Sequence, residues 1–168
     1  MPVDRALSPG DAEVAIRSFP RRFRALLARP DDEDERLDPD EIGRRPGPEG
    51  RTAVDHLVAA EHLLALLEET VAQVPGGEVR LPGAFADLGD ARFDDPGSSV
   101  PTLLDRLEAT AERTAHRIAA VPNDGWATPT RPPEGPGTSD VLAATQEVVG
   151  AVADHLRATA RVLAEVRT

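Results

Sequence analysis

Four long runs of apolar residues, spaced three and four apart, constrain the fold of this chain more than any other feature. They cover roughly residues 9–28, 51–75, 99–121 and 138–166. An α-helix places residues at this spacing on one face, and in no run do apolar and polar residues alternate as they do along a strand. We therefore expect an all-α fold with at most two short strands. Four amphipathic helices, each with one apolar face, predict a four-helix bundle.

Local signals mark where these helices begin and where one is disturbed. Ser8, with Asp11 three residues later, is typical of an N-cap with its partner acid, and Ser99 and Thr138 are the expected caps of the third and fourth helices. Pro20 lies inside the first run. Because proline lacks an N–H and clashes with the preceding turn, we expect a kink or a break there.

The length of 168 residues fits one domain, 1–168, with room for a hydrophobic core. The expected connections, 29–50, 76–98 and 122–137, are long and rich in charge, Gly or Pro. A helix of about 24 residues spans about 36 Å, and a loop of similar length can extend to about 80 Å. A connection can therefore return to the starting end, so that consecutive helices can run parallel.

Composition excludes several classes of function. The chain has no cysteine, which removes disulfides, thiolate metal sites and thiol nucleophiles. Its net charge of −11 opposes binding to nucleic acid or to anionic membranes. No apolar run is long enough to span a membrane, and the first residues lack a signal-peptide pattern, so we expect a cytoplasmic protein.

The histidines are the first candidates for chemistry at neutral pH. His56 and His62 are six residues apart, which places them about 120° apart around one helix, so they cannot share a metal ion. His116 is expected on the surface, and His155 flanks the apolar face of the last helix. The acidic run 31–35 lacks the ligand spacing of a calcium loop and is expected to be a solvated loop.

Glu61 and Trp126 each allow two interpretations. Glu61 is near the apolar face of its helix, either as a pocket carboxylate with a raised pKa or as a boundary residue paired with an Arg. Trp126 follows Asn-Asp-Gly, and packing over the end of the helices is a commoner role for it than stacking on a ligand. The sequence carries no nucleophile elbow, P-loop or dinucleotide-binding glycine motif.

Three segments, FPRRFRALLARPDD, RTAVDHLVAAEHLLALL and GWATPTRPPEGPGTSDVLAATQEVVGAVADHLRATARVL, together resemble the DinB/YfiT-like superfamily. This group includes actinobacterial relatives of mycothiol-dependent maleylpyruvate isomerase. The resemblance implies an up-down-down-up four-helix bundle. Many members bind a divalent metal through three histidines, some transfer low-molecular-weight thiols, and relatives often self-associate, which implies a homodimer as one state of this chain.

The family's metal-ligand positions are degenerate here. In the pattern W-[ST]-x-x-E-x-x-x-H, this chain has Arg51, Thr52, Asp55 and, at the ligand position, Ala59. In the pattern H-E-x-x-H-H of the last helix, Gly150 and Asp154 stand at the ligand positions and His155 follows them. A shift by one residue instead aligns Ala151 and His155. Ala and Gly offer a metal no lone pair, so the family's site cannot form in its usual way.

The lost ligands leave either a pocket or closer packing of the helices, in which His62 or His155 swings inward and this end is purely structural. In both cases we expect Ala59 to face Gly150, with Asp55 close to Asp154. The pocket candidates are Asp55, Ala59, Glu61, His62, Gly150, Asp154 and His155. The function expected is a metal-free small-ligand-binding or interaction module that needs no cofactor. The alternative is a metal- or thiol-dependent transferase or isomerase with a rebuilt zinc or nickel site, for which Glu61, Asp154 and His155 are the ligand candidates. Whether the chain is an enzyme stays open at this stage.

Overall fold

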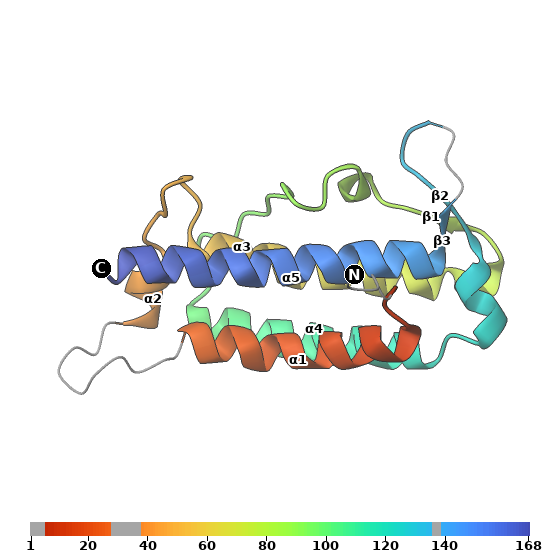
Figure 1. The fold of residues 1–168 in the computed structure, drawn as a ribbon, viewed down its shortest axis with the longest axis horizontal. Helices are drawn as coiled ribbons and strands as arrows, with labels where there is room; N and C mark the ends of the chain where they lie inside the picture. The colour runs from red at the N-terminus through yellow and green to blue at the C-terminus, as the bar shows by residue number, and fades with distance from the viewer. Residues whose placement is uncertain (1–5, 28–37, 136–138) are drawn as a thin grey trace, which may run out of the picture.

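The computed structural model describes residues 6–27, 38–135 and 139–168 and is mostly helical, which confirms the expected all-α class. Its α-helices are α1 (Pro9–Leu27), α2 (Pro39–Gly43), α3 (Ala53–Ala72), α4 (Val100–Ala119) and α5 (Val141–Val166). The four long helices lie side by side, and the short α2 lies at one end (Figure 1). None of the described helices is long and apolar enough to cross a membrane. The acidic run 31–35 lies outside the described residues.

The long helices pack in a closed set of pairs. α3 packs against α4 and α5, and α1 packs against the same two helices. Both α3 and α4 begin at the end of the molecule where α2 lies, whereas α1 and α5 begin at the opposite end (Figure 1). The connection from α3 to α4 therefore runs back along the whole length of the helices, as its length allows.

Side-chain caps begin each of the four long helices. Ser8 Oγ accepts a hydrogen bond from the backbone N–H of Asp11 at 3.1 Å, and Ser99 Oγ caps α4 in the same way. The expected cap of the last helix is wrong. Thr138 lies outside the described residues, and Asp140 caps α5 instead, through its side chain.

α1 is not broken at Pro20, where we expected a kink or a break. Pro20 is buried within a helix that continues for seven more residues to Leu27. Proline removes one N–H and so leaves the carbonyl of Ile16 without its usual partner. Ile16, Phe19, Phe23 and Leu27 are all buried, so tertiary packing holds the helix together across this position.

The structure contains a small sheet and a short helix that we did not expect. Most of their residues lie in the expected loops, but Ser139–Asp140 lies at the start of the expected fourth helix. The strands β1 (Val79–Arg80), β2 (Pro129–Arg131) and β3 (Ser139–Asp140) form a three-stranded sheet in the order β1-β2-β3, one strand more than expected. Each strand has only two or three residues, too few to show an alternating pattern in the sequence. α2 lies inside the expected loop 29–50. The 3₁₀ helices are η1 (Val74–Gly76), η2 (Gly83–Ala86) and η3 (Asn123–Ala127).

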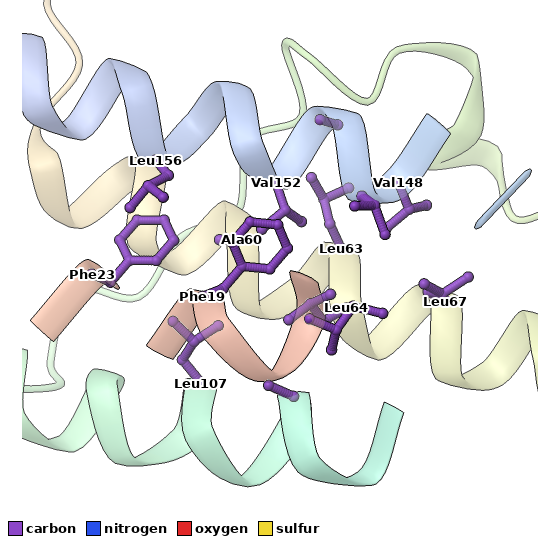
Figure 2. Close-up of a cluster of buried hydrophobic side chains, with 14 of the residues drawn as sticks. Phe19, Phe23, Ala60, Leu63, Leu64, Leu67, Leu107, Val148, Val152 and Leu156 are labelled. Atoms are coloured by element: carbon purple, nitrogen blue, oxygen red, sulfur yellow. The ribbon is translucent and has the colours of Figure 1, made fainter. Parts of the chain in front are cut away.

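The core lies between the long helices and is built from the apolar faces seen in the sequence. Phe19 and Phe23 project from α1 toward the side chains of the other three helices (Figure 2). These include Leu63, Leu64 and Leu67 of α3, Leu107 of α4, and Val148, Val152 and Leu156 of α5. Trp126 in η3 is buried and belongs to this core, as the packing interpretation predicted.

Candidate functional site

The structure does not bring the seven pocket candidates together. Ala59 is fully buried, but Gly150 is exposed on α5. A Cβ built on Gly150 would meet no atom within 4 Å, so this position does not face α3 as we expected. Asp154 is exposed as well and pairs with Arg157 on the surface of α5. The residues of α5 that do turn inward here are Ala151 and His155, the pair of the shifted alignment.

Asp55 stabilises the start of α3. Its Oδ2 accepts a hydrogen bond from the backbone N–H of Thr52 at 2.7 Å, and Thr52 Oγ1 accepts one from the N–H of Asp55 at 3.0 Å. This reciprocal capping box satisfies two N–H groups that a helix terminus leaves unpaired. Asp55 thus has a partner on its own helix, as Asp154 has in Arg157, and no hydrogen bond or ion pair of the described residues joins the two carboxylates.

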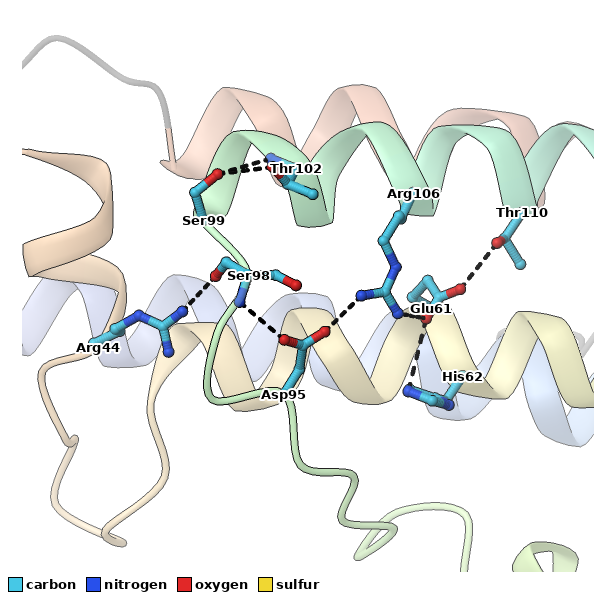
Figure 3. Close-up of polar contacts among 9 residues, drawn as sticks. All are labelled: Arg44, Glu61, His62, Asp95, Ser98, Ser99, Thr102, Arg106 and Thr110. Carbon is cyan, nitrogen blue, oxygen red and sulfur yellow. Dashed lines mark hydrogen bonds and ion pairs between the residues drawn. The ribbon is translucent and has the colours of Figure 1, made fainter.

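Glu61 is the centre of a polar network between α3 and α4 (Figure 3). Its carboxylate accepts hydrogen bonds from Arg106 at 3.1 Å and from Thr110 at 3.0 Å. Arg106 also donates to Asp95 at 2.5 Å. Hydrogen bonds from Ser98, together with this ion pair, lower the pKa of Asp95 to about 2. Glu61 is thus a boundary residue paired with an Arg, the second of its two interpretations.

The same network fastens the long connection onto the outside of α3. His62, 3.8 Å from Glu61, stacks on Phe93 with ring centroids 4.4 Å apart and an angle of 3° between the planes. Phe93 and Asp95 belong to the segment 81–99, which crosses from the sheet end back to α4 (Figure 1). The roles of Glu61 and His62 are therefore to hold this segment in place.

A pair of buried imidazoles, which no pattern in the sequence predicts, joins α3 to α5. The Nδ1 atoms of His56 and His155 are 3.0 Å apart, and the two residues are 7% and 3% exposed. Spacing within one helix relates His56 only to His62, and the family patterns point to His155 without naming a particular histidine as its partner. The two partners lie 99 positions apart in the chain, so only the packing of α3 on α5 reveals the pair.

Both imidazoles of the pair are neutral at pH 7. Burial, followed by the nearby Arg51, lowers the pKa of His56 to about 4. Burial also lowers the pKa of His155, although its hydrogen bond to the Leu88 carbonyl acts in the opposite direction. Protonation of both rings would place two positive charges next to each other in a buried site that disfavours even one positive charge.

The hydrogen bonds around the pair assign a tautomer to each ring. The carbonyl of Leu88, 3.4 Å from Nε2 of His155, can only accept, so this nitrogen carries the proton. His155 Nδ1 is then the acceptor, and His56 Nδ1 is the donor between the rings. Nε2 of His56 is left with an unprotonated lone pair.

A small cavity adjoins His56 at the end of the helices where α2 lies. Its volume is about 160 Å³, and its lining includes Glu49, Arg51, His56, Arg161, Val162 and Glu165. Arg51 is buried, and its guanidinium donates to the Ala91 carbonyl at 3.2 Å. The segment 81–99 therefore contacts the pair through the Leu88 carbonyl on His155, and it contacts the neighbouring Arg51 through the Ala91 carbonyl.

These residues do not fit a metal ion of the kind that the family resemblance implies. The two Nδ1 atoms already bond to each other, and the carboxylates of Asp55 and Asp154 have other partners. Across residues 6–27, 38–135 and 139–168, no three His, Cys, Asp or Glu side chains are grouped as metal ligands. Zinc sites in proteins commonly use three or four protein ligands.

Comparisons of the chain with models of known families, with characterised proteins and with solved structures find no match.

Proposed function

We propose that this chain is a DinB-like four-helix bundle that binds a small molecule without a metal ion. The observation that carries the proposal is the neutral His56–His155 pair beside a cavity of about 160 Å³. Titratable groups whose pKa burial shifts strongly and that lie beside a cavity are typical of binding and catalytic sites. A cavity of this volume accommodates a molecule of roughly the size of benzene.

The helix directions support the topology in this proposal. α1 and α5 begin at one end and α3 and α4 at the other (Figure 1), which is the up-down-down-up order of the family. The buried position of His155 on α5 supports the shifted alignment to the family's last helix, in which Ala151 replaces one ligand. The bundle thus retains one family histidine and lacks the partners that would complete a metal site.

A metal- or thiol-dependent transferase is the second candidate, because His56 and His155 bring two nitrogen donors from two helices to one point. To coordinate a metal ion, both rings would have to break their mutual hydrogen bond, and a third side chain would have to move close enough to be a ligand. We favour the metal-free function because the described residues supply no such third ligand.

Metal analysis of the full chain, purified without a His-tag, decides between the two candidates. We expect less than one tenth of an equivalent of zinc or nickel, and no change in melting temperature on adding a chelator. Near-stoichiometric metal, whose removal lowers stability, would overturn the metal-free proposal. A fragment screen followed through the imidazole NMR resonances of His56 and His155 tests binding, with exposed His116 as the internal control.

We also propose that the ligand is not a nucleic acid, because the net charge is −11 and phosphate binding needs clustered positive charge. A salt-sensitive gel shift at sub-micromolar protein would contradict this.

A further inference from the structure

Arg51 is a buried positive charge whose contacts leave most of its hydrogen-bonding capacity unused. It is 9% exposed, and the one hydrogen bond that its guanidinium makes to a described residue goes to the Ala91 carbonyl. Within the described part of the chain, no carboxylate lies within ion-pairing distance of its guanidinium. Buried charges in proteins are normally paired, and a guanidinium has five N–H donors in a fork that fits a carboxylate.

The unused donors of Arg51 have access to the cavity. Among the described residues, Thr130 Oγ1 is the one fully buried side-chain nitrogen or oxygen without a hydrogen-bond partner. The remaining guanidinium nitrogens of Arg51 therefore keep some accessible surface, and Arg51 lines the cavity. The same argument applies to Nε2 of His56, which has no partner among the described residues; His56 is a lining residue of the cavity as well.

The two side chains offer complementary chemistry to one ligand. Arg51 donates two parallel hydrogen bonds to an anion, and the lone pair on Nε2 of His56 accepts one from a hydroxyl or an ammonium group. The exposed carboxylates of Glu49 and Glu165 also line the cavity, so they would repel a second negative charge on the ligand. The positive charge of Arg161, an exposed residue that also lines the cavity, offsets one of these two negative charges.

We propose that this cavity binds a small monocarboxylate that carries a hydroxyl or ammonium group beside the carboxylate. Arg51 holds the carboxylate, and His56 accepts a hydrogen bond from the neighbouring donor. The inference rests on the proposed metal-free binding function and names its ligand class.

Three compounds of nearly equal size test the class of ligand on the full wild-type chain. Lactate, alanine and propionate share one carbon skeleton and one carboxylate, and carry a hydroxyl, an ammonium group or only hydrogen beside it. Lactamide keeps the hydroxyl and removes the negative charge. By calorimetric titration we expect lactate or alanine to bind about tenfold more tightly than propionate, and lactate about ten- to a hundredfold more tightly than lactamide.

Variants then assign the two contacts. Arg51→Gln should weaken lactate binding by about ten- to a hundredfold, whereas Arg157→Gln, on the exposed face of α5 and outside the cavity, should leave it unchanged. His56→Asn keeps a donor for His155 but loses the free nitrogen, so it should abolish the preference for lactate over propionate. If Arg51→Gln does not fold, the comparison of lactate with lactamide on the wild type decides the question.

The outcomes distinguish a failure of the proposed ligand class from a failure of the metal-free binding function. Equal binding of lactate and lactamide, or no binding of any of the three carboxylates, would overturn the ligand class. If uncharged fragments nevertheless shift the resonances of His56 and His155, the metal-free binding function is supported and only the proposed ligand class is wrong. Stoichiometric metal in the untagged protein would instead overturn that function.

Discussion

The buried histidine pair should make the protein lose stability between pH 6.5 and pH 4. His56 has an unfolded-state pKa near 6.5 and a folded-state pKa of about 4, so the unfolded chain binds a proton more readily in this window. The contribution of the neutral ring is fully present above pH 6.5 and is lost as the pH falls through about 4. One pKa unit corresponds to about 1.4 kcal/mol, so the loss for His56 is on the order of 3 kcal/mol.

Charged groups on both helices act on His56 in this range. Arg51 and Arg161 lower its pKa, as does His155 across the pair, while Asp55 raises it. Asp95 does not interfere, because its pKa of about 2 confines its effect to more acidic solution. The pH dependence between 6.5 and 4 should therefore be dominated by the two imidazoles.

Urea unfolding followed by circular dichroism at pH 7.5, 6.5, 5.5 and 4.5 measures this effect. His56→Asn should make the free energy of unfolding depend less steeply on pH, because asparagine does not titrate. The difference in slope should correspond to the uptake of about one proton on unfolding. His116→Asn, on the exposed face of α4, is the matched control and should leave the dependence unchanged. If wild type and His56→Asn lose stability equally between pH 6.5 and 4.5, the pair does not titrate as argued.

Three further substitutions test the rest of the structure. Gly150→Ala should raise the free energy of unfolding by about 0.5–1 kcal/mol in chemical denaturation, since the position is helical, exposed and open to a Cβ; a loss would mean that Gly150 faces another helix. Phe19→Ala should cost about 3–5 kcal/mol, because this ring is 1% exposed in the core, and a cost below about 1 kcal/mol would contradict that packing. Asp95→Asn should lower the melting temperature at pH 7. The difference from wild type should shrink as the pH falls from about 4 through about 2, because wild-type Asp95 becomes protonated in this range; a difference that stays constant over the range would not come from its charge.

Much of the site was beyond prediction because its residues meet only through tertiary contacts. The spacing of six residues between His56 and His62 correctly indicates that they lie on different faces of the helix, but it does not identify a partner on another helix. The side on which Gly150 and Asp154 lie depends on the rotation of α5 about its axis. A shift of one residue turns a helix by about 100°, which is enough to exchange Gly150 for Ala151 on the inner face.

The sequence alone determined that four long helices form and which faces they bury, because the apolar spacing and the caps act within a few residues of one another. Ile16, Phe19 and Phe23 on α1 and Leu57, Leu64 and Leu67 on α3 are buried as their spacing predicts. The tertiary structure decided the route of the segment 81–99, the pairing of His56 with His155 and the cavity beside Arg51. These depend on contacts between residues tens of positions apart, which form only when whole helices dock, and no local pattern in the chain encodes them.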